Sequence, residues 1–530
     1  MRNLKRKERA WMTKVTHEER YIRPCEKKLI DANRAYWADT SNAACGEEWI
    51  YTYHTVQGLF EFAVHEGVVA KGLQAKEKLP LAAISYEDGS CKLWDELDDS
   101  FGIQVHLHVH SEELKGTLAN GRAAKAAKRY ADATYGNKEE LLKIQYRGIF
   151  CGDVLYDEIT RKKSNVTYDC FAGGLDTYYH HIWTAFTLIE WAYATFRKRK
   201  PKYLITAEYV GLQALICSVA CMFGAQLLFV DNMRAGTAVR VFPSTVREQR
   251  LTTAEILRCR ILESLKNMDK TAVYEDLFIY TIENSPQQKW LQELGVENGK
   301  KNVFIMLHVL GDVPRESYRQ NVYIGYNEWY LDTLSIIKQI PDVNWIIKDH
   351  PFSDMYGQGD YVRAVFEENK TSNMYWCDKT ISGMQIKEAA DCVITCAGDV
   401  GIEYWAYGIP TITLAETYYY EQGISYHMNS RKEYEHVLRH LEGLERPAPE
   451  SMQRARNYLA AYKNEQERAD AFTKLLFCSR KEQINNAKTA DFEDTFSRVR
   501  YIFCKGYMEL LHDQKIRSSE VYKLERILDL

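Results

Sequence analysis

The sequence predicts an α/β protein with two doubly wound, Rossmann-like domains and a helical extension at each end. Three observations lead to this prediction. The chain of 530 residues, 46% hydrophobic and 27% charged, is globular in composition and too long for one core. Short apolar runs alternate with helix-length segments, as in parallel sheets that helices cover on both faces. This alternation occurs twice, before and after a long segment with no such pattern.

The first alternation predicts an N-terminal domain at 46–300. Short runs rich in aromatic and β-branched residues predict strands at 49–55, 80–87, 103–110, 203–209 and 226–231. Apolar periodicity predicts helices at 57–77, 117–133, 178–199 and 210–224. The last part of this domain, 232–300, should be a helical connection, broken at NSPQQ and GVENGKK.

The second alternation predicts a C-terminal domain at 301–445. Strands are expected at 302–309, 344–350, 373–378, 391–397 and 410–415, with helices at 327–340, 359–369, 383–390 and 400–407. The breaker ERPAP ends the pattern. Residues 446–530 then form a helical extension, with packing positions at Tyr458, Tyr462, Phe472 and Leu476. In two domains of this kind the ligand is expected in the cleft between them, at the carboxyl ends of the strands.

Composition excludes several classes of protein. A formal net charge of −4 gives no indication of a nucleic-acid partner. The apolar stretch 214–225 is too short to span a bilayer. Residues 1–45 form a basic arm, which is either a solvated helix or a contact with the anionic inner face of the plasma membrane. Thirteen cysteines without a CxxC pair, and no secretory signal, predict a cytoplasmic protein.

The strand at 344–350 ends in Lys348-Asp349-His350-Pro351. The proline restricts His350 to extended backbone geometry and so fixes the direction of its ring. An imidazole can donate a hydrogen bond to phosphate, and Lys348 supplies positive charge. These residues therefore predict an anion site, unless they merely cap the strand.

A small-residue turn around Gly398 lies between the strand 391–397 and the helix 400–407. Its backbone N–H groups and the positive end of the helix would face an anion. Glu403, one turn inside the helix, is either a group that accepts two ribose hydroxyls or an exposed helix residue.

Acidic residues in the N-terminal half are candidates for a general base. Glu87 and Asp88 follow a predicted strand, although Glu-Asp-Gly is also a common turn. Asp153, Asp157 and Glu208 are alternatives.

Two further clusters have an ordinary and a functional interpretation. His106, His108 and His110 share one strand face, but a spacing of about 7 Å is awkward for three metal ligands, so no metal is expected. Tyrosines 418–420 either line the site of the donor's base or form an aromatic loop. No P-loop, GxSxG, HExxH or kinase motif is present.

The segments 308–317, 326–351 and 391–425 resemble the capsule polysaccharide biosynthesis family, whose members have the GT-B fold and include Kdo transferases. The family has a strand that ends in Lys-x-His-Pro, followed by a Gly-Thr/Ser-x-Gly-x-Glu turn. The segments 146–162 and 207–225 are also similar, so the likeness covers roughly 50–430.

The resemblance implies a GT-B-like fold, with two domains that face a cleft, and a donor site in the second domain. Lys348, His350 and Pro351 would face the donor's phosphate, the Gly398 turn would cradle it, and Glu403 would hold the ribose. His308 and Asp312 correspond to a His and an Asp after the first strand of this half.

The sequence departs from the family at Asp399, where a hydroxyl residue is usual. A carboxylate here would repel a diphosphate, so either Asp399 caps the helix and turns away or the donor site is altered.

SYEDGS at 85–90 resembles an acidic element of bacterial sialyltransferases, in which one acid deprotonates the acceptor. This likeness implies catalytic roles for Glu87 or Asp88, together with His350.

These likenesses imply a metal-independent glycosyltransferase that needs no cofactor beyond its nucleotide-sugar co-substrate. The sugar, Kdo or sialic acid, would come from a CMP donor and pass to a surface or capsular polysaccharide or a glycolipid. A polyol-phosphate transferase of the teichoic-acid type and a non-catalytic scaffold of a polysaccharide assembly complex remain alternatives.

Overall fold

The structure is a computed structural model. It describes residues 22–40, 46–55, 60–86, 92–109, 118–161, 167–230, 238–241, 252–266, 289–320, 322–354, 356–379, 381–467, 470–476 and 492–523.

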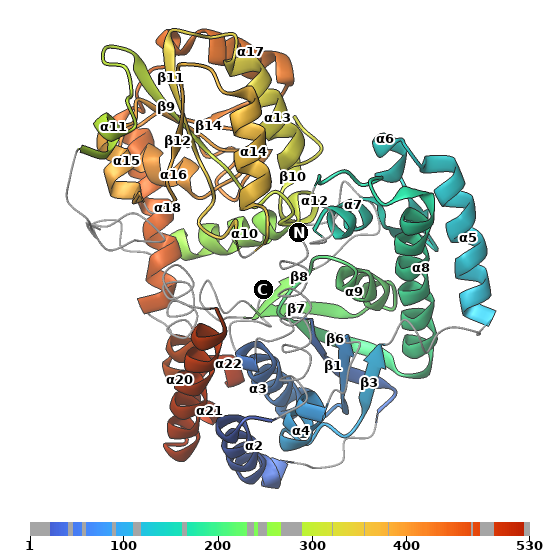
Figure 1. Ribbon diagram of the computed structural model, residues 1–530. Helices are drawn as coiled ribbons and strands as arrows, with labels where there is room; N and C mark the ends of the chain where they lie inside the picture. The colour runs from blue at the N-terminus through green and yellow to red at the C-terminus, as the bar shows by residue number, and fades with distance from the viewer. Residues whose placement is uncertain are drawn as a thin grey trace.

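The N-terminal domain contains a six-stranded sheet in the order β3-β2-β1-β6-β7-β8 (Figure 1). Five strands are parallel: β1 (Glu48–His54), β2 (Leu81–Tyr86), β3 (His106–Val109), β6 (Lys200–Thr206) and β7 (Gln226–Val230). The chain builds outward from β1 on one side and then returns to build on the other, as in a doubly wound sheet. The edge strand β8 (Ala238–Val241) pairs antiparallel with β7 inside the segment predicted as a helical connection, so that prediction is wrong at 238–241.

Helices cover both faces of this sheet. One face packs against α5 (Leu118–Thr134), α8 (Gly174–Lys198) and α9 (Gln213–Met222), and the other against α2 (Pro24–Trp37), α3 (Phe60–Glu77) and α4 (Lys92–Ser100). The domain also contains α6 (Lys138–Leu141), α7 (Gly152–Arg161) and the short hairpin of β4 (Gln145–Tyr146) and β5 (Ile149–Phe150).

The C-terminal domain contains a second six-stranded sheet, entirely parallel, in the order β12-β11-β9-β13-β14-β16. Its strands are β9 (Lys301–Met306), β11 (Val343–Lys348), β12 (Met374–Cys377), β13 (Cys392–Ile394), β14 (Thr411–Thr413) and β16 (Tyr426–His427). Every residue of β11 is buried, as expected for an inner strand covered on both faces. The strand order reverses between β9 and β13, where a doubly wound sheet binds its ligand.

The helices of this domain are α13 (Tyr326–Ile337), α14 (Gly359–Asn369), α15 (Gly383–Ala389), α16 (Val400–Ala406) and α17 (Arg431–Arg439). A small antiparallel pair joins β10 (Arg319–Gln320) to β15 (Ala415–Glu416). Helix α11 (Lys289–Glu293) precedes β9, and α10 (Thr253–Lys266) packs against α18 (Pro449–Glu467). The predicted pair of Rossmann-like domains is therefore confirmed.

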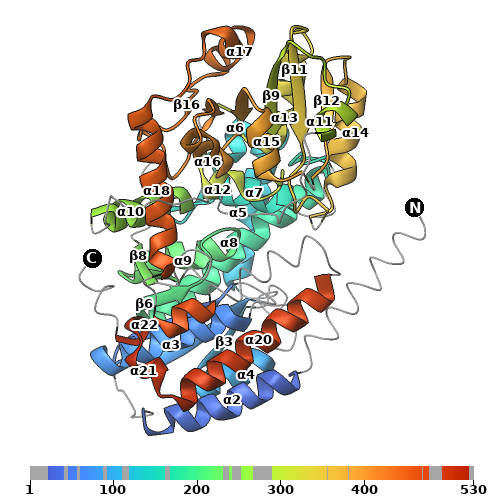
Figure 2. The ribbon, with the colours of Figure 1, turned by 90° about the vertical axis from the view of Figure 1, so that its left-hand side faces the viewer.

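The chain after α18 returns to the N-terminal domain. Tyr458 and Tyr462 pack beside α16 and α10, whereas Phe472 and Leu476 lie in the core that covers α3. Helix α20 (Phe492–His512) then runs beside α2 (Figure 2), and the short helices α21 (Lys515–Ser518) and α22 (Glu520–Lys523) follow it.

Helix α2 is part of this packing, so a solvated helix is the wrong prediction for that part of the basic arm. Leu29, Ile30 and Trp37 are buried, and Glu26 forms an ion pair of 2.7 Å with Arg500 on α20. Residues 1–21 lie outside the described part of the chain. Over the residues that are described, no helix has the length and hydrophobicity needed to cross a membrane.

The two domains meet where α7 packs against the four-residue helix α12 (Pro314–Ser317). Both carboxylate oxygens of Asp157 accept the backbone N–H of Arg315 at 3.1 Å, and one also accepts the N–H of Glu316 at 2.9 Å. The Arg315 guanidinium pairs with Asp153 at 2.8 Å. In return, Glu316 accepts the backbone N–H of Gly211 in the N-terminal domain at 2.6 Å.

Candidate functional site

The residues that follow β9, β11 and β13 lie at one edge of the C-terminal sheet. Strand β9 pairs with β11 on one side and β13 on the other, and all three run parallel. Their carboxyl ends bring together His308, His350 and the Gly398 turn, which the sequence had placed in one site.

His308 holds the Gly398 turn through its ring. Its Nε2 accepts the backbone N–H of Ala397 at 3.0 Å and lies 3.1 Å from the Thr395 hydroxyl. The ring stacks on Tyr326, with centroids 4.2 Å apart. Burial, and the nearby charge of His350, lower the pKa of His308 to about 3, so its ring is neutral.

His350 is held by contacts within its own loop. Its backbone N–H donates to Asp349 at 2.7 Å, and its Nδ1 accepts the N–H of Phe352 at 3.2 Å. Burial raises the pKa of Asp349. Pro351 is half-buried and begins the turn that follows.

Lys348 points toward the edge strand β12, on the side of β11 away from Gly398. It is buried, and its Nζ donates to the backbone carbonyls of Asp378 at 3.1 Å and Lys379 at 3.0 Å. In this arrangement Lys348 ties β11 to the end of β12, which does not favour the phosphate contact implied by the family resemblance.

Tyr419 and Thr395 fix the Gly398 turn from both sides. The N–H of Gly398 donates to the Thr395 hydroxyl at 3.2 Å, and its carbonyl accepts the Tyr419 hydroxyl at 2.7 Å. A side chain at Gly401 would overlap that same hydroxyl, so glycine is required there. The tyrosines at 418 and 419 are buried in the core of the domain.

The two acids of this turn differ from the sequence expectations. Asp399 precedes α16, but its side chain makes no capping hydrogen bond, so the helix-cap explanation is wrong. Burial, and then the charge of Asp399, raise the pKa of both Tyr418 and Tyr419. Glu403 is only 5% exposed, which contradicts the alternative of an exposed helix residue.

Asp312 and Glu208 bring carboxylates from the two domains toward one arginine. Part of the Asp312 side chain is exposed, but many protein atoms surround its carboxylate. The resulting loss of solvation raises the pKa of Asp312, and the charge of Arg161 opposes this shift. Burial disfavours the charge on Arg161, but Asp312, Glu208 and Glu158 outweigh it and raise the pKa of Arg161. Asp312 also raises the pKa of Tyr356 to about 12. Groups from the ends of β6, β9 and β11 thus interact across the domain boundary.

Asp153 and Asp157 are unsuited to act as a general base, because both are used in the contact between the domains. The predicted bases Glu87 and Asp88 lie outside the described residues. Glu208 remains a candidate for the general base, because its carboxylate interacts with Arg161 near the boundary between the two domains.

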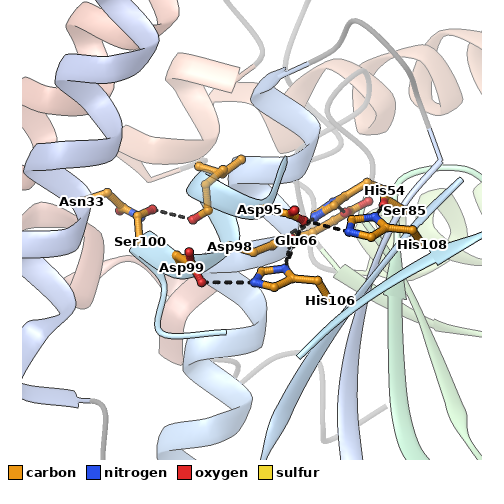
Figure 3. A network of polar contacts seen from close by, with 11 residues as sticks. Asn33, His54, Glu66, Ser85, Asp95, Asp98, Asp99, Ser100, His106 and His108 are labelled. Atoms are coloured by element: carbon orange, nitrogen blue, oxygen red, sulfur yellow. Dashed lines mark hydrogen bonds and ion pairs between the residues drawn. The ribbon is translucent and has the colours of Figure 1, made fainter. Parts of the chain in front are cut away.

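A polar network lies at the carboxyl ends of β1 and β2 and along β3 (Figure 3). His54 ends β1 and contacts Glu66 of α3 at 2.6 Å and Asp98 of α4 at 3.1 Å, with all three side chains buried. Burial opposes charge on His54, but the two carboxylates raise its pKa to about 10, while burial raises the pKa of Glu66 to about 7. Glu66 also accepts the backbone N–H of Ala207 at 2.9 Å, so the network joins β1 to the end of β6.

His106 and His108 belong to the same network and share one carboxylate. Each has a ring nitrogen 3.3 Å from the same oxygen of Asp95, and His108 also contacts the Ser85 hydroxyl at 2.8 Å. No group of three or more His, Cys, Asp or Glu is arranged to hold a metal ion within the described ranges. His110 lies outside the described residues.

The sequence reasoning did not identify the contact of His54 with Glu66 and Asp98. One signal was available, since His54 and Thr55 are polar residues at the end of the predicted strand 49–55. The two partners of His54 come from different helices, and periodicity does not show which helical residues turn toward that strand.

A pocket lined by 46–49, Leu79 and 197–200 lies at the amino ends of β1 and β6. This is the opposite edge of the sheet from His54 and Glu208, so the pocket is not part of the candidate site.

Comparisons with known proteins give distant likenesses only. No protein-family model matches the sequence. No curated protein matches it either.

Three solved structures represent the similar folds that were found. A KpsC β-Kdo 2,4-transferase of Thermosulfurimonas dismutans is 12% identical over 50% of this chain and 80% of that one, with a TM-score of 0.30. A glycosyltransferase of Rickettsia africae is 10% identical over 83% and 98%, with a TM-score of 0.29. HepE of Anabaena, in complex with UDP, is 11% identical over 82% and 99%, also with a TM-score of 0.29. At such low TM-scores these likenesses carry no argument, and the fold assignment rests on the strand order.

Proposed function

We propose that this protein is a glycosyltransferase whose C-terminal domain binds a nucleotide-sugar donor and whose N-terminal domain binds the acceptor. The observation that carries the proposal is the convergence of His308, His350 and Gly398 at the point where the strand order reverses. Doubly wound sheets bind nucleotides at this position, because turns there present backbone N–H groups to phosphate.

The charge of the described site favours a donor with one phosphate. His308 is neutral, and the ammonium of Lys348 is directed to backbone carbonyls. Asp399 and Glu403 add carboxylates nearby. Like charges repel strongly where water is scarce, so a diphosphate would be poorly compensated. A CMP-linked acid sugar such as Kdo or sialic acid carries the same total charge as a UDP-linked sugar, but only one of its two negative charges lies on the phosphate, so it suits this turn better.

The transfer needs a carboxylate near the acceptor hydroxyl and hydrogen-bond donors on the leaving phosphate. In this proposal the hydrogen-bond donors to the leaving phosphate are His350, the Gly398 turn and His308. The carboxylates to test as the general base near the acceptor hydroxyl are Glu208, Asp312, Glu87 and Asp88. The acceptor is a surface or capsular polysaccharide or a glycolipid.

Calorimetry with CMP, CDP and UDP tests the donor site. We expect CMP to bind most tightly, and His350→Ala or Glu403→Ala to weaken binding by about tenfold or more. His436→Ala, an exposed position on α17, is the matched control. If no nucleotide binds, the enzyme proposal fails and the scaffold alternative gains.

Labelled donors test the reaction itself. Transfer of the sugar without the donor's phosphorus supports a glycosyltransferase. If phosphorus travels with the product, the protein is a polyol-phosphate transferase instead.

The proposal includes association with the inner face of the plasma membrane through the basic residues 1–21. Binding should require vesicles that contain anionic lipid and should weaken steeply with salt, because salt screens each Lys or Arg contact. Binding to neutral vesicles, or none to anionic ones, would contradict it.

A further inference from the structure

The hydrogen bonds of His308 determine which ring nitrogen carries its proton. A backbone N–H can only donate, so the contact from Ala397 to Nε2 at 3.0 Å requires that nitrogen to be an unprotonated acceptor. The neutral ring must then carry its proton on Nδ1. The Thr395 hydroxyl, 3.1 Å from Nε2, can donate to the same lone pair.

The ring is also fixed in orientation, with the edge that carries Nε2 and Cε1 facing the Gly398 turn. Its face stacks on Tyr326 at an interplanar angle of 9°, and it makes a T-shaped contact with Trp329 at 73°. The Cε1 atom, which lies between the two nitrogens, would be 3.6 Å from a Cβ built on Gly398. Among the residues that the structure describes, Nδ1 has no hydrogen-bond partner.

We propose that His308 positions the Gly398 turn through Nε2 and donates a hydrogen bond from Nδ1 to the leaving phosphate of the donor. This inference rests on the proposed function for the identity of the ligand. His308 then acts as a neutral donor and not as an acid, since a neutral imidazole does not release its Nδ1 proton near pH 7. The leaving phosphate departs without a proton from this residue.

Burial supports the same assignment, because it lowers the pKa of His308 to about 3. A charged ring would also bring a proton to Nε2 and break the contact with Ala397. The ring should therefore stay neutral throughout the pH range in which the protein is folded and active.

Nitrogen NMR on protein labelled in its histidine rings tests the tautomer directly, with His308→Gln to assign the signals. We expect a protonated Nδ1 and an unprotonated Nε2 that do not titrate between about pH 5.5 and 8. Addition of CMP should move the Nδ1 proton signal downfield. A proton on Nε2, titration in this range, or no response to bound CMP would overturn the inference.

Two substitutions separate the functions of the two nitrogens. His308→Gln can place an acceptor near the position of Nε2, so we expect a nearly unchanged melting temperature and CMP affinity weaker by about tenfold. His308→Asn can place a donor near Nδ1 but leaves Ala397 without its acceptor, so it should melt earlier. If His308→Gln binds CMP as tightly as the wild type, the Nδ1 contact does not exist.

The two proposals can fail separately. If the wild type binds no nucleotide, the proposed function is lost, whereas NMR still decides the tautomer. If the wild type binds CMP and the proton is on Nε2, only the assignment of His308 fails.

Discussion

Asp157 in the N-terminal domain accepts the backbone N–H of Arg315 on both of its carboxylate oxygens, each at 3.1 Å. Arg315 belongs to the first turn of α12 in the C-terminal domain, where Val313 provides no side-chain cap. The N–H groups that begin a helix need acceptors, and here the neighbouring domain provides one. The contact therefore holds α7 of one domain against α12 of the other.

Asp157→Asn should destabilise the protein by about 1–3 kcal/mol, because one of two buried acceptors is lost. Urea unfolding followed by fluorescence measures the change. Asp360→Asn, an exposed position on α14, is the control and should leave the midpoint unchanged. Equal midpoints for Asp157→Asn and the control would show that the cap contributes nothing.

Lys348→Met should lower stability by about 1–3 kcal/mol and leave nucleotide affinity unchanged. The substitution keeps the apolar stem but removes the donors to the carbonyls of Asp378 and Lys379. Unfolding and calorimetry on the same sample distinguish the two effects, with Lys338→Met as an exposed control. A well-folded Lys348→Met that no longer binds nucleotide would restore the phosphate contact suggested by the sequence.

Gly401→Ala should cost about 1–3 kcal/mol, because the added methyl group overlaps the Tyr419 hydroxyl. Removal of that hydroxyl makes room, so Gly401→Ala combined with Tyr419→Phe should be more stable than the two separate costs predict. Gly443→Ala meets no atom within 4 Å and is the control. Simple additivity in thermal unfolding would argue against the overlap.

His54 should make stability fall as pH rises. The folded protein keeps a proton on His54 up to about pH 10, whereas the unfolded chain loses it near pH 6.5. Its contribution is complete below pH 6.5 and is lost toward pH 10, by up to about 1.4 kcal/mol per pH unit in that window.

Glu66 acts in the same direction at lower pH, because its folded pKa of about 7 lies above its ordinary value of 4.5. Urea midpoints measured across these windows test the prediction. His54→Gln should flatten the decline above pH 6.5, and His512→Gln, on the surface, should not. A wild-type midpoint that is constant between pH 6.5 and 10 would mean that His54 is neutral in the folded protein over this range.

The sequence predicted the two sheets well because their strands leave strong signals. Trp345, Ile346 and Ile347 are all buried on one short segment, and a polar group follows immediately. The same logic placed His308, His350 and Gly398 in one site, since the ends of neighbouring parallel strands share an edge.

The sequence did not predict the directions of long side chains. Lys348 reaches toward β12 instead of β9, and Asp157 reaches into the other domain, because each finds backbone groups that periodicity does not reveal. The sequence placed helix α2 in an exposed arm because basic residues outnumber acidic ones over the first thirty positions. Its apolar face is covered by α20, which lies more than four hundred residues later in the chain.

The return of the final helices to the N-terminal core determines when that core can form. Leu29 and Ile30 pack in one cluster with Phe503, Tyr507 and Ile516, and Asn33 accepts a hydrogen bond from Tyr507 at 2.9 Å. During translation the N-terminal half of this sequence emerges early, but the cluster can form only after α20 and α21 have been synthesised. The domain made first is therefore completed last, and a ribosome that stalls after residue 445 leaves exposed apolar surface on α3 for chaperones to cover.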